Sequence, residues 1–444
     1  MYSLLTFSDI MKNAGGVLAA VAVLLAMVTI HEFGHYLAGK ILGFKINEFS
    51  VGFGPAIFKK RSKKTGELFA LRVVPLGGYC AFDGEDEADE ETEKSPEDKK
   101  NAADEPFAEM AETGESGEKA GSLRAEEIAE EIAEENQAQS GKESESDYPE
   151  PKGIRFNDQP PWKRIIVLLA GATMNYLLGL LLIFVMFVSV GRPMYSVVKE
   201  KPDKNEEAAA NGVRSSLFLD TQDGEVEENG LCTGDVIVRI EGKKVYLISD
   251  YLSALKGKNA GDTAKIEVLR EENGERVSRI VEVTLAVSSS EFDALTKTGY
   301  MVRSLGVYAL APVTQREGFG RAAGDSFAYS FKEAGMVLSS LGQLITGKIP
   351  LKSMGGPITT IRITSQQATS GWLSFLNIAS FIGVNLAVFN LLPIPALDGS
   401  KIVFCIIEWI RKKPINRKVE AMIHFIGIIV LFGFAILVDF LQFL

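Results

Sequence analysis

The chain has 444 residues, of which 46% are hydrophobic and 24% charged, and its formal net charge at pH 7 is −11. The charge is unevenly distributed, because residues 83–150 hold 26 acidic and 6 basic residues whereas the other 376 residues have a net charge of +9. The three cysteines, Cys80, Cys232 and Cys405, stand far apart in the sequence. That spacing excludes a disulfide-stapled secreted domain and a zinc site made of four thiolates.

Four segments are long and apolar enough to cross a membrane, which takes about 20 largely apolar residues. They are residues 15–42, 164–190, 372–399 and 421–444. The first segment could instead be a cleaved signal peptide, since Lys12 precedes it. Its apolar stretch is longer than the roughly 7–15 residues of a signal-peptide core and continues through a polar cluster, which favours a membrane span.

Basic residues near the spans predict the orientation of the chain, because such residues are retained on the cytoplasmic side. We therefore expect a multi-pass protein of the inner or plasma membrane with residues 43–163 in the cytoplasm, and with both termini and residues 191–371 outside it. The basic residues follow the first span and precede the second and fourth spans: Lys45, Lys59, Lys60, Arg61, Lys63, Lys64, Arg155, Lys163, Arg164, Arg411, Lys412, Lys413, Arg417 and Lys418.

The expected cytoplasmic segment has two parts. Residues 43–82 alternate apolar and polar side chains in places around Thr65-Gly66, which predicts a membrane-associated β-hairpin with its turn at that dipeptide. Residues 83–150 are an acidic low-complexity insert with almost no aromatic side chains, so they bury too little apolar surface to become ordered. We expect a solvated insert with a short helix around residues 123–136 and no catalytic role.

The expected extracytoplasmic segment contains a compact β-rich module at residues 205–312. Strand-like runs at 236–240, 264–269 and 277–287 surround a helical pattern at 249–255.

An amphipathic juxtamembrane region follows at residues 313–371. Within it, residues 325–350 have helical spacing, and the sequence supports two positions for this helix about equally, on the membrane surface or packed against the β-rich module. Its apolar residues lie on or near one side of the helix: Phe327, Phe331, Met336, Val337, Leu341 and Leu344.

The chemistry of the chain centres on an H-E-x-x-H motif, residues 31–35, in the second half of the first span. Positions i and i+4 share one face of a helix, so His31 and His35 can bind one metal ion while Glu32 points towards its open position. Each ionisable side chain within a span costs about 2.5–3.5 kcal/mol. The alternative, a polar cluster satisfied by backbone groups, leaves an uncompensated carboxylate beside two imidazoles, so a metal site is favoured.

A catalytic zinc site usually has three protein ligands, so a third ligand must come from elsewhere in the chain. Asp398 is our choice, because Pro393 and Pro395 stop the helix before it and free backbone groups within the membrane. Irregular backbone at that depth occurs only where it is buried in protein or lines a wet cavity. His424 stays open as an alternative ligand, whereas we expect Glu408 at the membrane interface and Asp439 near the outer end of its span.

Two motifs together resemble the site-2 protease family of intramembrane zinc metalloproteases, and specifically its bacterial regulator-of-sigma protease type. They are the H-E-x-x-H motif of residues 31–35 and the N-x-x-P-x-P-x-L-D-G pattern of residues 390–399. Further matches cover most of the chain outside the insert: Gly52-Phe53-Gly54-Pro55, Pro75-Leu76-Gly77-Gly78-Tyr79, the G-x-x-x-N run from Gly171 to Asn175, and Gly355-Gly356-Pro357-Ile358.

The resemblance implies a four-helix transmembrane metalloprotease core with the membrane-associated β-hairpin and one extracytoplasmic PDZ domain. The PDZ assignment depends on residues 234–242, similar to the G-D-x-I-x-x-I-x-G turn of that domain. Where family members often have a Lys-Met pair after G-G-Y, this chain departs from the pattern with Cys80-Ala81-Phe82 and then the acidic insert.

The resemblance also implies residue roles. Zn²⁺ is held by His31, His35 and Asp398, and Glu32 is the general base. Substrates are single-span membrane proteins, such as anti-sigma factors or remnant signal peptides, already shortened by a site-1 protease. Membrane lipid is the other partner, and no nucleic acid is expected. The expected substrate-binding residues lie around this site and on the hairpin edge: Asn385, Asn390, Pro393, Pro395, Leu71, Val73, Gly171 and Asn175.

Alternatives remain for several of these roles. Asn385 could simply join two helices by hydrogen bonds, and Gly171 with Asn175 could form a close-packing face continued by Gly179. The chain as a whole could be a membrane-anchored PDZ scaffold without proteolytic activity. A transporter with a helix broken at Pro393 and Pro395 is disfavoured, because the four spans show no inverted repeat.

Overall fold

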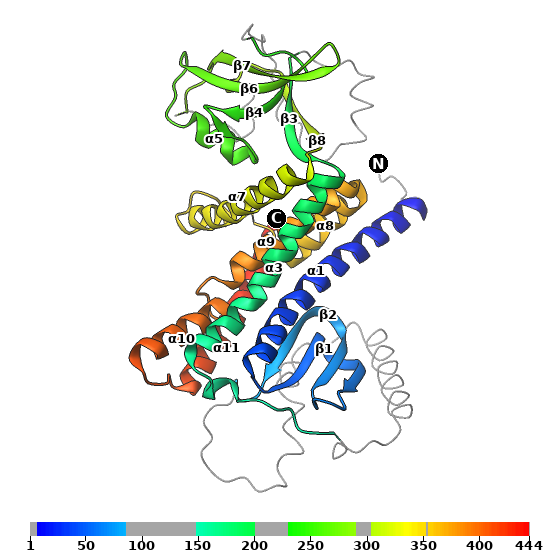
Figure 1. Cartoon of the computed structure of the whole chain (residues 1–444), viewed down its shortest axis with the longest axis vertical. Helices are drawn as coiled ribbons and strands as arrows, with labels where there is room; N and C mark the ends of the chain where they lie inside the picture. The colour runs from blue at the N-terminus through cyan, green and yellow to red at the C-terminus, as the bar shows by residue number, and fades with distance from the viewer. Residues whose placement is uncertain (1–6, 86–147, 200–229, 290–302, 352–353, 444) are drawn as a thin grey trace. The chain divides into compact units, whose positions relative to one another are not determined.

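The computed structural model describes residues 7–85, 148–199, 230–289, 303–351 and 354–443. The expected helix at 123–136 and nearly all of the acidic insert lie outside the described residues. The chain, drawn in Figure 1, forms two compact units. The first unit comprises residues up to 20 together with 176–388, and the second comprises residues 21–175 together with 389–444.

Within the described part of the chain, four helices are long and apolar enough to cross a membrane. They are α1 (Phe7–Leu42), α3 (Pro161–Ser189), α9 (Trp372–Asn390) and α11 (Arg417–Phe443). The helical conformation satisfies the backbone hydrogen bonds within each segment, and side chains that are mostly Leu, Ile, Val, Phe and Ala suit hydrocarbon. The protein is therefore an integral membrane protein.

The third of these helices is shorter than the expected segment of residues 372–399. Helix α9 ends at Asn390, and a separate helix, α10 (Asp398–Arg411), begins at the aspartate. Pro393 and Pro395 explain the break, because proline lacks the N–H that a helix interior requires. Helix α10 was not predicted from the sequence.

The second unit contains a sheet made of two long strands, β1 (Ile46–Arg61) and β2 (Leu68–Phe82), joined near Gly66 as expected. The strands bend, so that Val51 lies opposite Gly78 on one side and Leu71 on the other. Leu71 also pairs with Phe58. The segment around Leu71 is thus paired on both sides, and the expectation that it offers an open edge is wrong. The outer segments of the sheet are residues 56–61 and 78–82.

A hydrophobic cluster joins the sheet to the helices of the second unit. Phe44 and Phe82 pack against Phe156, which lies in the short 3-10 helix η3 (Phe156–Asp158). The other buried members come from the sheet, α3 and α10: Ile46, Cys80, Val167, Leu168 and Cys405.

Helices α3, α10 and α11 are also joined by a buried ion cluster. Glu408 is 5% exposed, forms an ion pair with Arg164, and has its Oε1 atom 3.0 Å from Arg417 Nη2. Two arginines from neighbouring helices therefore compensate the charge of Glu408 inside the protein. The expected position of Glu408 at the membrane interface stays a prediction.

The first unit contains a six-stranded sheet in the order β7-β6-β4-β3-β8, with β5 paired to β4. The helix α5 (Ile248–Leu255) covers its core, in which Ile237, Ile266 and Leu255 are buried. The expected strands of the β-rich module coincide with β4, β6 and β7 to within a few residues. The strand bounds are Arg192–Val198 (β3), Val236–Ile240 (β4), Lys243–Lys244 (β5), Thr263–Glu272 (β6), Glu275–Thr284 (β7) and Ala309–Gln315 (β8).

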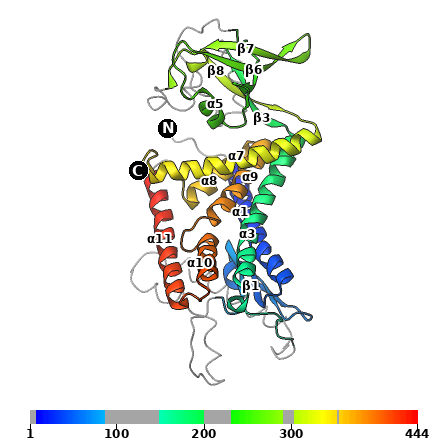
Figure 2. The same cartoon turned by 60° about the vertical axis from the view of Figure 1, so that its left-hand side comes forward.

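Helix α7 (Phe319–Ile345) lies between the sheet and α9 in both views, and α8 (Pro357–Ser370) precedes α9 (Figures 1 and 2). Tyr329 and Val337 on α7 are buried, whereas Phe327 and Phe331 are 52% and 57% exposed. The expected single apolar side is therefore split: part of it packs inside the unit, and a stripe of large apolar side chains faces outward.

Candidate metal centre

The H-E-x-x-H motif lies on α1, which is regular through this region. His31 and His35 are one turn apart, and both are buried, at 8% and 7% exposure. Their rings meet edge to face with centroids 4.7 Å apart. Helical spacing alone therefore brings the two Nε2 atoms to 3.1 Å from each other, as the sequence analysis expected.

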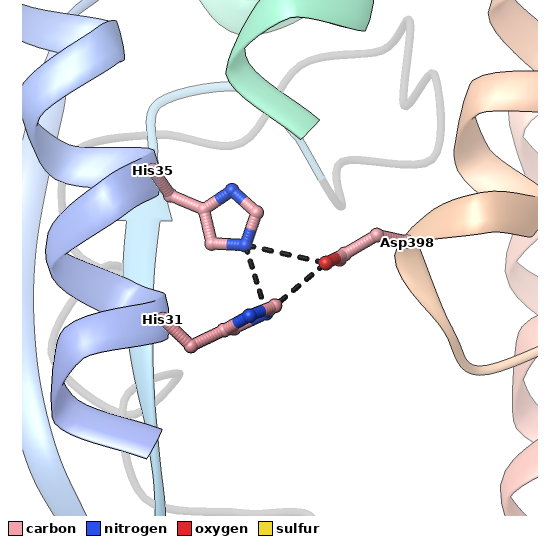
Figure 3. A group of neighbouring side chains, drawn as sticks. All are labelled: His31, His35 and Asp398. Atoms are coloured by element: carbon pink, nitrogen blue, oxygen red, sulfur yellow. Dashed lines mark hydrogen bonds and ion pairs between the residues drawn. The ribbon is translucent and has the colours of Figure 1, made fainter. Parts of the chain in front are cut away.

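Asp398 approaches the two histidines from the first residue of α10 (Figure 3). Its Oδ2 atom lies 3.1 Å from His31 Nε2 and 3.3 Å from His35 Nε2. Gly399 allows the chain to turn here, because a Cβ atom at that position would lie 2.2 Å from the Leu392 carbonyl oxygen. Among the described residues, this is the one group of three His, Cys, Asp or Glu side chains whose ligand atoms converge, all within 4.8 Å.

The donor set fits a zinc ion. Two imidazole nitrogens and one carboxylate oxygen are a usual three-ligand set for catalytic zinc, which keeps a fourth position open. His35 Nδ1 lies 2.9 Å from the Val167 carbonyl oxygen, which only accepts hydrogen bonds. In the neutral ring the proton is therefore on Nδ1, and the lone pair of Nε2 faces Asp398 Oδ2. With its Nδ1 proton held by a backbone carbonyl, His35 has the orientation typical of a metal-binding histidine.

Helix α3 packs against the histidine face of α1 through glycines. A Cβ atom on Gly171 would lie 2.3 Å from His35 Nε2 and 2.8 Å from His31 Cε1. On α1, a Cβ atom on Gly34 would lie 2.5 Å from the Ala170 carbonyl oxygen. The imidazoles thus occupy space that any larger residue at 171 would fill. The sequence analysis selected Gly171 but missed Gly34, although Gly34 stands inside the motif.

Two asparagine amides surround His31. Asn175 Nδ2 lies 3.4 Å and Asn390 Nδ2 3.3 Å from His31 Nδ1. Asn175 is 1% exposed, and its Oδ1 atom is buried without a hydrogen-bond partner among the described residues. The structure therefore brings two of the selected polar residues to the edge of the metal-binding group.

Glu32 is close enough to His31, His35 and Asp398 to interact electrostatically with each of them. The sheet also reaches it: a Cβ atom on Gly78 would lie 3.4 Å from Glu32 Cγ. The outer sheet segment 78–82 therefore begins beside the glutamate of the motif.

The remaining residues selected from the sequence lie on the sheet, in the loop before Asp398 and in the first unit. Leu71 and Val73 are 44% and 50% exposed on the sheet, and Pro393 and Pro395 lie in the loop that precedes Asp398. Asn385 belongs to the first unit, where its buried Oδ1 has no hydrogen-bond partner within the described residues.

One feature of the site gave no signal in the sequence. The Val167 carbonyl acts through its backbone, which no side-chain pattern reveals. His424 contacts the loop before Asp398 rather than joining the converging group.

Comparison with known proteins agrees with a membrane peptidase. The sequence profile of Peptidase family M50 matches residues 19–434, so the chain belongs to this family. M50 peptidases depend on zinc, and the predictions of a peptidase and of zinc as its cofactor are confirmed.

Relatives match over almost the full chain. The Regulator of sigma-W protease RasP of Bacillus subtilis is 28% identical over 437 residues, which is 93% of this chain and 94% of that protein. A zinc metalloprotease RasP of Bacillus licheniformis is 28% identical over 93% of this chain and 94% of its own length. A putative zinc metalloprotease of Fusobacterium nucleatum is 24% identical over 95% and 96%.

Proposed function

We propose that this protein is an intramembrane zinc endopeptidase that cleaves peptide bonds within or near the transmembrane segments of single-span membrane proteins. The observation that carries the proposal is the convergence of His31, His35 and Asp398 within 4.8 Å in a chain with four apolar spans. These three residues are the proposed metal ligands, and Glu32 is the proposed general base.

The proposed chemistry follows from these positions. A zinc ion held by the three ligands would polarise the scissile carbonyl and lower the pKa of an adjacent water. Glu32 takes the proton of the attacking water and passes it to the leaving amine. Its position one residue after His31 on a regular helix lets it face the same centre without being a ligand.

Asn175 and Asn390 have separate proposed roles. An amide can present its oxygen or its nitrogen from the same side-chain position. With its oxygen towards His31, Asn175 accepts the Nδ1 proton, which leaves the His31 Nε2 lone pair for the metal and satisfies the buried Oδ1. Asn390, on the loop side, donates its amide to the main chain of an extended substrate.

A helical substrate must unwind before cleavage, since its carbonyls are already hydrogen-bonded along the helix axis. Strand addition to a sheet edge satisfies the backbone groups that unwinding frees. We assign this edge to residues 78–82, because this outer segment begins at Gly78 beside Glu32, whereas the Leu71 segment is paired on both sides. Leu71 and Val73 contact the substrate only through their side chains in this arrangement.

The first unit supplies the proposed recognition of the extracytoplasmic part of a substrate. Its β-rich module is assigned as a PDZ domain at residues 205–312, supported by the turn at Gly234 (φ +95°) and by the buried Asp235, which pairs with Arg270. The module docks a shortened substrate or excludes an intact one. A cavity of about 640 Å³ beside it is lined by β3, α5, α7 and α9.

The proposed orientation keeps residues 43–163 in the cytoplasm and both termini and the module outside it, as the basic residues predict. Helix α7 then lies at the outer membrane surface with its exposed stripe towards lipid: Phe319, Phe327, Phe331, Leu338 and Ile345. Domain bounds follow the expectations of the sequence, with the third span shortened to residues 372–390.

Proposed substrates are single-span proteins already shortened by another protease. The Bacillus subtilis relative is named a regulator of sigma-W protease. Anti-sigma factors and remnant signal peptides are therefore the first substrate classes to test.

The main rival, a PDZ scaffold without activity, differs from a protease in its response to Glu32→Gln. The variant keeps the size and position of the side chain but not the base, so cleavage of a single-span reporter should fall by at least about 100-fold while zinc content stays at about one per chain. Glu282→Gln on the exposed strand β7 is the matched control. Unchanged cleavage in Glu32→Gln would remove Glu32 as the base.

The assignment of the substrate edge is tested by disulfide cross-linking. In a Glu32→Gln chain whose native cysteines are replaced by alanine, Ala81→Cys probes segment 78–82 and Lys60→Cys probes segment 56–61. We expect a reporter with a cysteine next to its cleavage site to cross-link to position 81. Cross-linking to position 60 alone would move the substrate to the other edge.

A further inference from the structure

The loop of residues 391–397 carries Asp398 but has few backbone donors with which to hold its shape. Pro393 and Pro395 have no N–H. Three other N–H groups bond locally: Leu392 to Phe389, Ile394 to Leu392, and Leu397 to Ile394. The Ala396 N–H is different, because it donates to Nδ1 of His424 on α11, at 3.2 Å. The N–H group of Ala396 is thus bound by a side chain of another helix and not by the loop itself.

Ala396 also has an unusual backbone conformation. Its φ is +80°, in the left-handed region that residues with a Cβ atom rarely adopt. Such a residue persists only where its surroundings hold it in place. The contact with His424 is made at this strained residue, two positions before Asp398.

Helix α11 contacts the same loop a second time, one turn further along. A Cβ atom on Gly427 would lie 2.4 Å from Pro395 Cβ and 2.8 Å from the Pro395 carbonyl oxygen. Only glycine allows the helix to approach this closely. The His424 ring also packs against Phe404 of α10, with ring centroids 5.7 Å apart and an interplanar angle of 68°.

We propose that His424 is a positioning residue for the metal site and that, with Gly427, it clamps the Ala396 turn so that Asp398 meets His31 and His35. His424 acts as the neutral tautomer with its proton on Nε2, because Nδ1 needs a lone pair to accept the Ala396 N–H. This inference rests on the proposed role of Asp398 as a metal ligand. It assigns His424 to the loop and not to the ligand set.

Two replacements of His424 separate the hydrogen bond from the bulk of the ring. His424→Phe keeps a ring but removes the acceptor, and His424→Asn places an amide oxygen near the position of Nδ1. We expect zinc affinity, measured by competition with a chromophoric chelator on detergent-purified full-length protein, to fall about 10-fold in His424→Phe, the size of other losses of a ligand's supporting contact. His424→Asn should restore it to within about threefold of wild type. The Co²⁺ absorption spectrum should change in His424→Phe alone.

The clamp has a matched pair of variants within α11. Gly427→Ala meets Pro395, whereas a Cβ atom on Gly433 has no heavy atom within 4 Å. Zinc affinity should fall in Gly427→Ala and stay unchanged in Gly433→Ala, with both proteins monodisperse in detergent.

Three outcomes contradict the clamp: a monodisperse His424→Phe protein with wild-type zinc affinity and Co²⁺ spectrum, equal loss in His424→Phe and His424→Asn, or equal affinities in the two glycine variants. The Asp398→Ala variant, measured beside them, distinguishes a failure of the proposed metal site from a failure of the clamp alone. If Asp398→Ala keeps wild-type zinc affinity, the proposed metal site itself fails. If it loses zinc while the His424 variants do not, only the clamp fails.

Discussion

The proposed metal-binding group has two arms that differ in how the chain builds them. The helix arm presents His31 and His35 from α1, where regular 3.6-residue spacing alone aligns two side chains. The loop arm presents Asp398 after seven irregular residues, in which Ala396 has a positive φ and Pro395 touches Gly427. The helix arm is therefore fixed by local geometry, whereas the loop arm depends on contacts from a distant helix.

Removing a ligand from either arm should have the largest effect. His31→Ala and Asp398→Ala each remove one of the three proposed ligands, and we expect zinc affinity to fall by at least about 100-fold in both, roughly the free energy that one ligand contributes. Zinc per chain and chelator competition on detergent-purified protein measure this. If zinc affinity falls strongly in His31→Ala but is unchanged in Asp398→Ala, Asp398 is not a ligand. The loop arm would then have no role in binding zinc.

Adding one methyl group beside the helix arm should have the next largest effect. The Cβ atom in Gly171→Ala would overlap both imidazoles, so the rings must turn away, and we expect zinc affinity to fall by about 10- to 100-fold. Gly15→Ala on α1, where a Cβ atom meets nothing within 4 Å, is the control. Equal affinities in the two variants would show that the helix arm tolerates crowding.

Removing the amide next to His31 should have a smaller effect. Asn175→Leu keeps the volume of the side chain but not the acceptor for the Nδ1 proton, and we expect zinc affinity to fall about 10-fold. Asn175→Asp, which keeps the acceptor oxygen, should retain most of the affinity. If Asn175→Leu binds zinc like wild type, the residue is only part of the close-packing face with Gly171.

Glu333, a buried carboxyl group outside both arms, provides a comparison with Asp398, which faces two histidines. Glu333 on α7 is 2% exposed, its Oε2 has no hydrogen-bond partner among the described residues, and burial raises its pKa to about 8 from an ordinary 4.5. Between these two pH values the folded state keeps a proton that the unfolded state loses. The free energy of unfolding should therefore fall by about 1 kcal/mol for each pH unit between pH 5.5 and 7.5, and level off above pH 8.

Thermal unfolding of wild type and Glu333→Gln across pH 5–8.5 measures this smallest effect. The amide stays neutral at every pH, so the difference in melting temperature between the two proteins should shift in favour of Glu333→Gln as the pH rises. A difference that is independent of pH would mean that Glu333 ionises alike in the folded and unfolded states.

The same contrast explains what could be predicted from the sequence. The four spans, the strands β4, β6 and β7 and the pair His31 and His35 follow from local hydrophobicity and spacing, which are properties of neighbouring residues. Helix α10, the doubly paired segment around Leu71 and the burial of Glu408 were missed or expected wrongly. The burial of Glu408 and the pairing of the Leu71 segment depend on partners elsewhere in the chain: Arg164 for Glu408, and residues 46–51 for the Leu71 segment.

The distance along the chain between the two arms has a consequence for the biosynthesis of this protein. His31 and Asp398 are 367 positions apart, and His424 lies 26 residues beyond Asp398. A nascent chain that has inserted only its first spans lacks the third proposed ligand, and a product truncated before α11 lacks the contact at Ala396. Proteolytic competence should therefore arise only after the last helix has entered the bilayer, so that incomplete chains in the membrane pose no threat to neighbouring proteins.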